Sequence, residues 1–308
     1  MIEPDSYSYP RYLRAKRTVD ARSLNRRVWE HFLDALPDTS SRHQILEVGG
    51  GIGATFQRLL KALLDKKIGA TTLHYTLVDR EPANIRAARE QVTMWAKNHG
   101  YDVDSTQEGI RLSCGPIEAQ LTLVTADLFA FVDRNSRDTF DVVIGQAVLD
   151  LLNLRGFFNA HRPILKEGGL WYLPIHFDGV TGFEPRLDPQ LDDHIERLYH
   201  ESMGGTDEEG GRRAHTGRQL LTVLREQGDQ VLAAGASDWV VYPRQDGYQS
   251  DEEYFLHHII HFIEEELSDH SRIEKSSFQD WIQTRRHQIH DGELIYIAHQ
   301  LDVLARHK

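Results

Sequence analysis

The fold is constrained most by an alternation of short apolar segments with segments of helical spacing along the first half of the chain. The apolar segments of strand length are residues 44–48, 72–79, 119–127, 140–148 and 170–177, and the helical segments between them are residues 54–66, 82–98 and 153–166. Strands that alternate with helices predict a parallel sheet with helices on both faces. The sequence therefore predicts a doubly wound α/β domain.

The rest of the chain predicts additions to this sheet. Residues 19–36 have the spacing of one amphipathic helix, and we expect residues 1–42 to form an N-terminal helical cover of a domain spanning residues 43–308. Further predicted elements are a helix over 216–227, two helices within 250–290, and strands at 230–242 and 293–305. They complete a seven-stranded, mostly parallel sheet whose last strand is antiparallel, with insertions at about 178–214 and 244–290.

Charge and cysteine content exclude several classes of partner. The chain has 308 residues and a formal net charge of −12, which disfavours a broad nucleic-acid footprint. Cys114 is the only cysteine, which excludes an intrachain disulfide and a cysteine-rich metal centre. No apolar run has membrane-spanning length, and the N-terminal residues lack the pattern of a secretory signal. We expect a cytoplasmic monomer or homodimer with no metal, nucleic-acid partner or membrane contact.

A glycine-rich segment follows the first predicted strand. In "EVGGGIG", Gly49, Gly51 and Gly53 lie between that strand and the next helix. At the carboxyl end of a parallel strand, such a turn presents backbone amides and a helix N-terminus to a nucleotide-like cofactor. The letters Gly49-x-Gly51-x-x-Ala54 also satisfy the dinucleotide fingerprint, so the glycines alone leave two cofactor classes open.

The residues around the glycines resemble motif I of the class I S-adenosylmethionine-dependent methyltransferases, in which an acid precedes the glycines as Glu47 does here. An acid at this position suits a cofactor that carries a sulfonium and an ammonium, whereas it would repel a pyrophosphate. The resemblance implies a Rossmann-like fold, S-adenosyl-L-methionine as the cofactor and methyl transfer as the activity. An NAD-dependent dehydrogenase is the weaker alternative.

The resemblance extends along the chain and implies further cofactor-binding residues. Asp79, followed by Arg80, ends "YTLVD", where the family's acid binds the ribose hydroxyls. Asp127 and Leu128, in "TADLF", correspond to the residues that contact the adenine, and Gln146 lies where backbone receives the methionine moiety. "ILKEGGLWYLP" is similar to the segment that leads into the family's fifth strand. Asp79 and Asp127 also suit a structural alternative, in which each carboxylate caps a helix.

Two sequence motifs that the chain lacks disfavour a nucleic-acid base as the methyl acceptor. The Asp/Asn-Pro-Pro-aromatic motif of base-amino methyltransferases is replaced by "GQAVLD", and Cys114 precedes the position of a cytosine-methylating nucleophile. We therefore expect in-line methyl transfer to the oxygen or nitrogen of a small molecule, bound under the N-terminal segment and the two insertions. Because no general base is evident, a non-catalytic S-adenosylmethionine-binding protein is the alternative.

Six residues are candidates for acceptor chemistry. His176 ends the fifth predicted strand and Asp150 follows the fourth, and each is a catalytic candidate with a structural alternative: a hydrogen-bonded histidine and a polar helix residue. Arg14 and Arg17 lie three residues apart in a basic segment and are predicted to bind an anionic group of substrate or cofactor. His257 and His261 lie with Glu264 along one flank of a predicted helix. They are candidates for acceptor contact, proton transfer or metal binding, and the structural alternative is a polar helix edge exposed to solvent.

Overall fold

The computed structural model describes residues 4–36, 42–65, 71–107, 109–203 and 213–308. Its strands form one ten-stranded sheet in the order β3-β4-β5-β2-β1-β6-β7-β10-β8, with β9 pairing with β10. The strands are β1 (Arg42–Val48), β2 (Thr71–Asp79), β3 (Asp102–Ser105), β4 (Gly109–Cys114), β5 (Ile117–Thr125), β6 (Phe140–Ile144), β7 (Leu165–Glu184), β8 (Gln230–Ala236), β9 (Trp239–Val241) and β10 (Ile295–Arg306).

The centre of the sheet has the predicted doubly wound arrangement. Strands β5, β2, β1, β6 and β7 are parallel, and β10 runs antiparallel between β7 and β8. The predicted antiparallel last strand is therefore confirmed, but the predicted number of seven strands is wrong. A hairpin of β3 and β4 precedes β5, and the single strand predicted over 230–242 is interrupted between β8 and β9.

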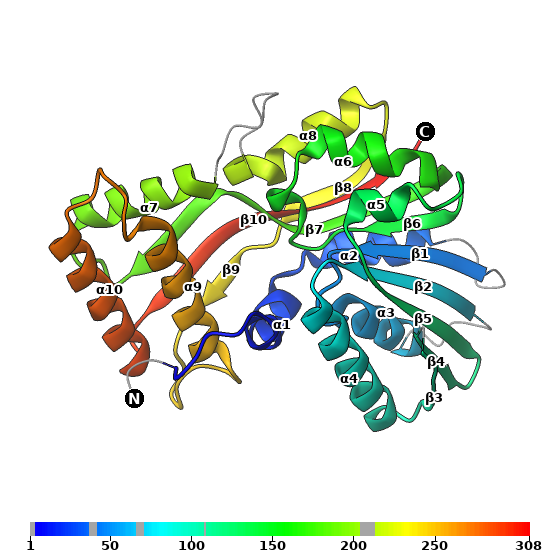
Figure 1. The fold of residues 1–308 in the computed structure, drawn as a ribbon, viewed down its shortest axis with the longest axis horizontal. Helices are drawn as coiled ribbons and strands as arrows, with labels where there is room; N and C mark the ends of the chain where they lie inside the picture. Colours follow the sequence, from blue (N-terminus) through cyan, green and yellow to red (C-terminus); the bar gives the residue numbers. More distant parts are fainter. Residues whose placement is uncertain (1–3, 37–41, 66–70, 108, 204–212) are drawn as a thin grey trace.

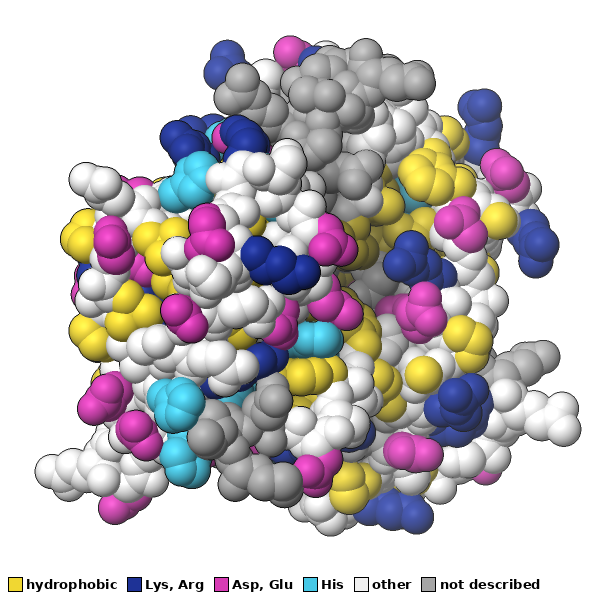
Figure 2. Space-filling view, turned by 60° about the vertical axis from the view of Figure 1, so that its left-hand side comes forward, with side chains coloured by type: hydrophobic (Ala, Val, Ile, Leu, Met, Phe, Trp, Pro, Cys, Tyr) yellow, Lys and Arg dark blue, Asp and Glu magenta, His cyan; other side chains and the backbone are white. Residues whose placement is uncertain are grey.

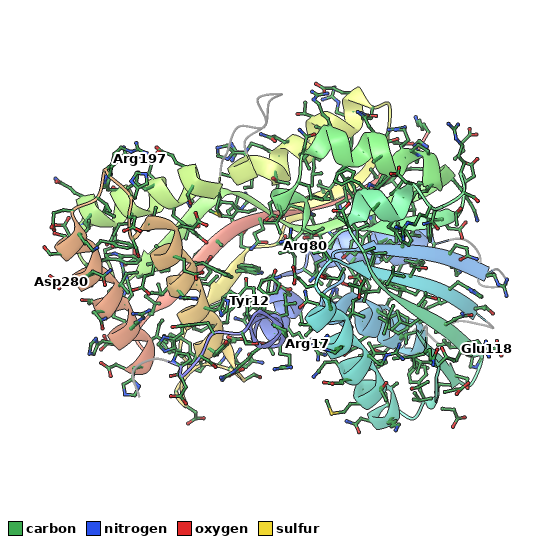
Figure 3. The ribbon with its side chains drawn as sticks, viewed as in Figure 1. Tyr12, Arg17, Arg80, Glu118, Arg197 and Asp280 are labelled. Atoms are coloured by element: carbon green, nitrogen blue, oxygen red, sulfur yellow. The ribbon has the colours of Figure 1, made fainter. Side chains whose placement is uncertain are left out.

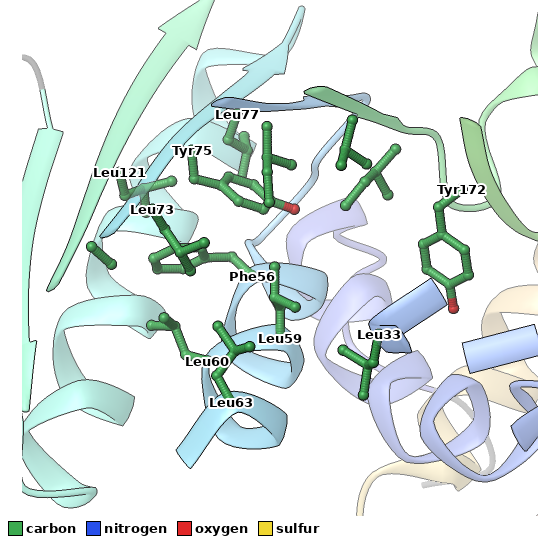
Figure 4. Close-up of a cluster of buried hydrophobic side chains, with 14 of the residues drawn as sticks. Leu33, Phe56, Leu59, Leu60, Leu63, Leu73, Tyr75, Leu77, Leu121 and Tyr172 are labelled. Atoms are coloured by element: carbon green, nitrogen blue, oxygen red, sulfur yellow. The ribbon is translucent and has the colours of Figure 1, made fainter. Parts of the chain in front are cut away.

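Helices cover both faces of the central strands (Figure 1). The helices are α1 (Tyr9–Ser23), α2 (Arg26–Ala35), α3 (Ala54–Asp65), α4 (Pro82–Asn98), α5 (Leu128–Val132), α6 (Leu154–His161), α7 (Pro189–Met203), α8 (Thr216–Glu226), α9 (Glu252–Leu267) and α10 (Lys275–His290). One face packs against α2, α3 and α4, and the other against α5, α6 and α8. In Figure 4, Leu73, Tyr75 and Leu77 of β2 lie over Phe56 and Leu59 of α3.

Two long strands carry a second part of the molecule. β7 continues through Glu184 and pairs with β10 along its length, so the sheet extends beyond the central strands (Figure 1). α1, α7, α9 and α10 pack with this extension around a second hydrophobic cluster. The expectation that the fifth strand ends at residue 177 is therefore wrong. Residues 204–212 of the predicted insertion lie outside the described residues, and the domain boundaries stay a prediction.

Two helix predictions are corrected. The helix predicted over 19–36 is two helices, because the chain turns at Leu24 and the side chain of Asn25 accepts from the Val28 N–H to begin α2. α6 ends at His161, short of the predicted residue 166, and Gly168 and Gly169 lie inside β7. None of the described helices has the length and apolar character needed to cross a membrane.

Candidate functional site

The glycine-rich turn lies at the carboxyl end of β1 and is packed against β2. Gly49, Gly51 and Gly53 have φ values of 62°, 53° and 76°, in the left-handed region that glycine adopts without strain. A Cβ on Gly50 would lie 2.3 Å from Cγ of Leu77, so no larger residue fits there unless the buried Leu77 side chain moves. The turn therefore brings backbone amides to the edge of the sheet before α3 begins.

Asp79 ends β2 and joins the turn to the next helix. Its Oδ2 accepts from the Gly51 N–H at 2.9 Å, and its Oδ1 accepts from the Glu81 N–H at 2.9 Å. Asn84 also donates to Oδ1 at 3.2 Å. The carboxylate thus holds both the turn and the segment that leads into α4, but it does not cap that helix, whose N-cap is Glu81. Arg80 is exposed and lies 3.4 Å from Glu81.

Glu47 lies beneath the turn. It is 2% exposed, and Tyr75 donates its hydroxyl to Oε2 of Glu47 at 2.8 Å. Burial raises the pKa of Glu47 to about 7, and hydrogen bonds from Thr55 and Tyr75 oppose that shift. Glu47 therefore changes charge near neutral pH, beside the backbone that we expect to meet the cofactor.

Asp127 is exposed at the end of β5 and begins α5. Its Oδ1 accepts from the Phe129 N–H at 2.9 Å and the Ala130 N–H at 3.1 Å, which is the capping geometry that the sequence left as an alternative. The Ala126 N–H donates to the Asp79 carbonyl at 3.1 Å. This bond keeps the ends of β5 and β2 together, so Asp127 and Leu128 lie beside the turn of Asp79.

Gln146 follows β6 and is held by α1 and α3. Its Oε1 accepts from Thr55 and Arg58, each at 3.1 Å, and its Nε2 donates to Oδ2 of Asp20 at 2.9 Å. The next residue, Ala147, has a φ of 51°, which is strained for a residue with a side chain. The backbone after β6 is thus fixed in an uncommon conformation beside the glycine turn.

A buried ion pair on α1 joins this network. Lys16 donates to Asp20 at 2.9 Å, and both side chains are 7% exposed. Asp20 also accepts from the Trp239 indole N–H at 3.0 Å. From the sequence, Lys16 was a weaker candidate than Arg14 and Arg17 for binding an anion, because it does not share their helix face. Lys16 lies four residues before Asp20, among Tyr12, Ala15 and Val19, which are buried. This spacing is the sequence signal that could have identified the buried ion pair.

The two arginines predicted to bind an anion are placed differently. Arg14 is exposed, and Arg17 donates to Oε1 of Gln57 on α3 at 2.9 Å. Figure 3 shows Tyr12 and Arg17 on α1, between the two parts of the molecule. A Cβ on Gly51 would lie 3.1 Å from Leu13, which places α1 next to the glycine turn. Arg17, not Arg14, thus lies beside the turn's helix.

His176 is fully buried in β7 with both ring nitrogens engaged. Nε2 lies 3.4 Å from the Leu149 N–H, and Nδ1 lies 3.3 Å from the Leu173 carbonyl. Burial lowers the pKa of His176 to about 3. This is the hydrogen-bonded structural alternative that the sequence left open, and it leaves no ring nitrogen to accept a proton from a ligand.

Asp150 lies in a 3-10 helix, Leu149–Leu151, that follows β6. Its carboxylate receives its own backbone N–H, and burial raises its pKa. Oδ1 is buried without a hydrogen-bond partner among the described residues. Of the two catalytic candidates, Asp150 therefore has the unused acceptor atom.

His257 and His261 do not meet a common partner. The pKa of His257 is lowered to about 4 by burial and by Arg286 and His290. His261 stacks on Tyr7 at 3.9 Å between ring centroids and lies 3.5 Å from Glu265. Within the described ranges, no group of His, Cys, Asp and Glu has metal-binding geometry. Acceptor contact by either histidine stays a prediction.

Known proteins resemble the chain only in structure. No family model and no curated protein matches the sequence. A methyltransferase from Aquifex aeolicus is 8% identical with a TM-score of 0.45, covering 96% of this chain and 99% of that one. One from Thiobacillus denitrificans, solved with S-adenosyl-L-homocysteine, is 13% identical with a TM-score of 0.43 and coverages of 96% and 99%. Geranyl diphosphate C-methyltransferase from Streptomyces coelicolor is 12% identical with a TM-score of 0.40 and coverages of 99% and 86%.

Because these similarities are weak, the strand order of the chain itself decides its fold. The order β5-β2-β1-β6-β7-β10-β8 has parallel central strands, an antiparallel β10 and the glycine turn after β1, in agreement with the predicted doubly wound sheet. The chain has a Rossmann-like, doubly wound α/β fold. In this fold the carboxyl ends of neighbouring parallel strands form the ligand-binding edge, and Gly49, Asp79 and Gln146 lie there.

Proposed function

We propose that the chain is a methyltransferase that uses S-adenosyl-L-methionine and methylates the oxygen or nitrogen of a small molecule. The observation that carries the proposal is the bond from Gly51 to Asp79, which brings a glycine turn and a carboxylate together at adjacent strand ends. A ribose needs such a carboxylate, and a methionine moiety needs the open backbone of the turn. A cytoplasmic location and action on a free metabolite are parts of this proposal.

The electrostatics of this edge suit a cationic cofactor. The pKa of Tyr9, on α1, is raised to about 12 by burial and then by the charges of Asp79 and Asp150, with Asp20 adding to them and Arg80 opposing. More acidic than basic side chains therefore act on this hydroxyl. A sulfonium and an ammonium are stabilised in such a field, whereas the pyrophosphate of a dinucleotide is repelled. This supports S-adenosylmethionine over NAD.

Each cofactor-binding residue has a separate proposed task. Asp79 receives the ribose hydroxyls, and Asp127 and the Leu128 amide receive the adenine. Gly49, Gly51 and Gly53 leave room for the methionine moiety, beside Gln146. The remaining two residues, Glu47 and Arg80, balance charge beneath and beside the turn.

The bound cofactor supplies an electrophilic methyl group and a leaving sulfur. The protein must align the acceptor and exclude water, and α1 lies beside the glycine turn, where Leu13 is the neighbour of Gly51. Asp150 is the proposed proton acceptor because its Oδ1 has no partner among the described residues. His176 is proposed to position the backbone after β6 through the Leu149 N–H.

Turnover separates an enzyme from a binding protein. The chain is incubated with S-adenosyl-L-methionine and a panel of small amines and alcohols, and release of S-adenosyl-L-homocysteine is measured. We expect release with at least one acceptor, and strong loss of it in Asp150→Asn. Cofactor binding without release from any acceptor would favour the non-catalytic alternative.

A further inference from the structure

A bulge interrupts β7 where this strand leaves the central sheet for the extension. The surface is hollowed between these two parts of the molecule (Figure 2). The register of β7 on β10 shifts here, so that two residues of β7, Pro174 and Ile175, lie opposite the single residue Asp302. Ile175 is buried and has a φ of 59°. A β-branched residue rarely adopts this left-handed conformation, and bulges and strained residues are concentrated beside functional sites.

The side chain of Asp302 holds this bulge. It is buried, and its Oδ1 accepts from the Ile175 N–H at 2.8 Å. Its Oδ2 accepts from the Asn25 N–H at 2.8 Å, at the turn between α1 and α2. The bond from a backbone N–H to a carboxylate is charge-assisted, and here the strained residue itself donates it. Asp302 therefore stabilises a backbone conformation that the branched side chain of Ile175 disfavours.

The strand segment that contains the bulge is bonded to the residues that follow β6. Three alternate residues after β6 donate to β7: the Gly145 N–H to the Tyr172 carbonyl at 3.0 Å, the Ala147 N–H to the Pro174 carbonyl at 3.1 Å, and the Leu149 N–H to Nε2 of His176 at 3.4 Å. Ala147, in the middle of this series, has the second left-handed conformation, with a φ of 51°. The backbone of residues 145–149 therefore follows that of residues 172–176.

Residues 145–149 also lie against the glycine turn. A Cβ on Gly49 would lie 2.5 Å from Cγ2 of Val148, so the Val148 side chain packs directly on this glycine. Gln146, one of the proposed cofactor-binding residues, belongs to the same segment. A change in the bulge of β7 would therefore reach the glycine turn through Val148 and Gln146.

We propose that Asp302 is a positioning residue of the cofactor site. Its carboxylate keeps Ile175 in the left-handed conformation, and the bonds from β7 then place residues 145–149 against Gly49. Asp302 acts through this backbone and not by contact with the cofactor. The proposal rests on the proposed function, because the site that Asp302 positions is the one assigned to S-adenosyl-L-methionine.

Calorimetric titration with S-adenosyl-L-homocysteine measures the effect of Asp302→Ala, which removes both accepting oxygens. We expect the affinity of the folded variant to fall about fivefold or more, although the substituted residue lies outside the turn. Asp229→Ala is the matched control, because Asp229 is also buried and is bonded to Arg162 at 2.8 Å, before the amino end of β7. This control should leave the affinity within about twofold of that of the unmodified protein.

Substitutions of Ile175 test whether the effect passes through the strained residue. Glycine adopts the left-handed conformation without strain, whereas alanine does not. In the Asp302→Ala background, Ile175→Gly should therefore bind S-adenosyl-L-homocysteine about fivefold more tightly than Ile175→Ala, which removes nearly the same buried side chain. An affinity loss below about twofold in Asp302→Ala, or equal affinities of the two double variants, overturns the proposal.

Hydrogen exchange of the unmodified protein, measured by NMR, keeps the test decisive if Asp302→Ala does not fold. Coupling between two sites is reciprocal, so a ligand whose binding depends on the bulge must also stabilise the bulge. S-adenosyl-L-homocysteine should slow exchange of the Ile175 and Ala147 amides more than that of the Asp229 amide. Equal slowing of all three overturns the proposal. Failure of S-adenosyl-L-homocysteine to bind the unmodified protein overturns the proposed function and, with it, this role of Asp302.

Discussion

Asp79 and Gly51 are joined by a 2.9 Å hydrogen bond that ties the end of β2 to the turn after β1. Asp79→Ala removes both this bond and the proposed ribose-binding carboxylate. Loss of charge-assisted hydrogen bonds costs about 1–3 kcal/mol, so the affinity for S-adenosyl-L-homocysteine should fall about 5- to 150-fold in calorimetry. Asp280→Ala, at an exposed site on α10, is the control. Unchanged affinity in Asp79→Ala would remove Asp79 from the site.

Gly50 leaves no room for a side chain. Gly50→Ala places a Cβ 2.3 Å from Cγ of Leu77, and overpacking of this kind costs about 1–3 kcal/mol of unfolding free energy. Gly182→Ala in β7 is the matched control, because a Cβ there meets no atom within 4 Å. Urea denaturation should show a loss only in Gly50→Ala. Equal stability of the two variants would contradict the packing of the turn on β2.

Two ion pairs of the same spacing should contribute differently to the unfolding free energy, because only one of them is buried. Lys16–Asp20 and Lys61–Asp65 are both i,i+4 pairs, at 2.9 and 2.7 Å, but only the first is buried. Asp20→Ala leaves a buried ammonium without its partner and also removes the acceptor of Trp239 and Gln146, so it should cost about 3–5 kcal/mol. Asp65→Ala removes an exposed pair and should cost about 0.5 kcal/mol or less. Similar losses in urea denaturation would show that Lys16 reaches water.

Glu47 should make stability depend on pH. Its pKa rises from 4.5 to about 7 in the folded chain, so between these pH values the folded state keeps a proton that the unfolded state releases. The unfolding free energy therefore falls as pH rises through this window and levels off above it, by about 3 kcal/mol. Glu47→Gln lacks this contribution. Urea denaturation at pH 5, 6, 7 and 8 measures the difference between the two proteins, and a constant difference would contradict the raised pKa.

The central strands were predictable because each is an apolar run of strand length that alternates with a segment of helical spacing. The hairpin of β3 and β4 was missed because β3, "DVDS", is polar and mostly exposed at the edge of the sheet. β7 was predicted to end at residue 177 because Asp178 and Gly179 break the apolar run. In the folded chain Asp178 is buried against Arg218 at 2.8 Å, a partner that local pattern does not reveal.

The residues of the candidate site were likewise predictable from the sequence only in part. Gly49, Asp79 and Asp127 follow predicted strands, so their order along the chain placed them at one edge of the sheet. Asp20 binds Gln146 across 126 residues of sequence, and no periodicity specifies such a pair. His176 was equally well placed by its strand, but the contact of its Nε2 with the Leu149 N–H depends on the 3-10 helix after β6.

Calorimetric titration with S-adenosyl-L-homocysteine tests the central claim most directly. We expect saturable binding to one site per chain, weakened in Asp79→Ala, and no binding of NADH. Absence of S-adenosyl-L-homocysteine binding to the folded protein, or tighter binding of NADH, would contradict the account.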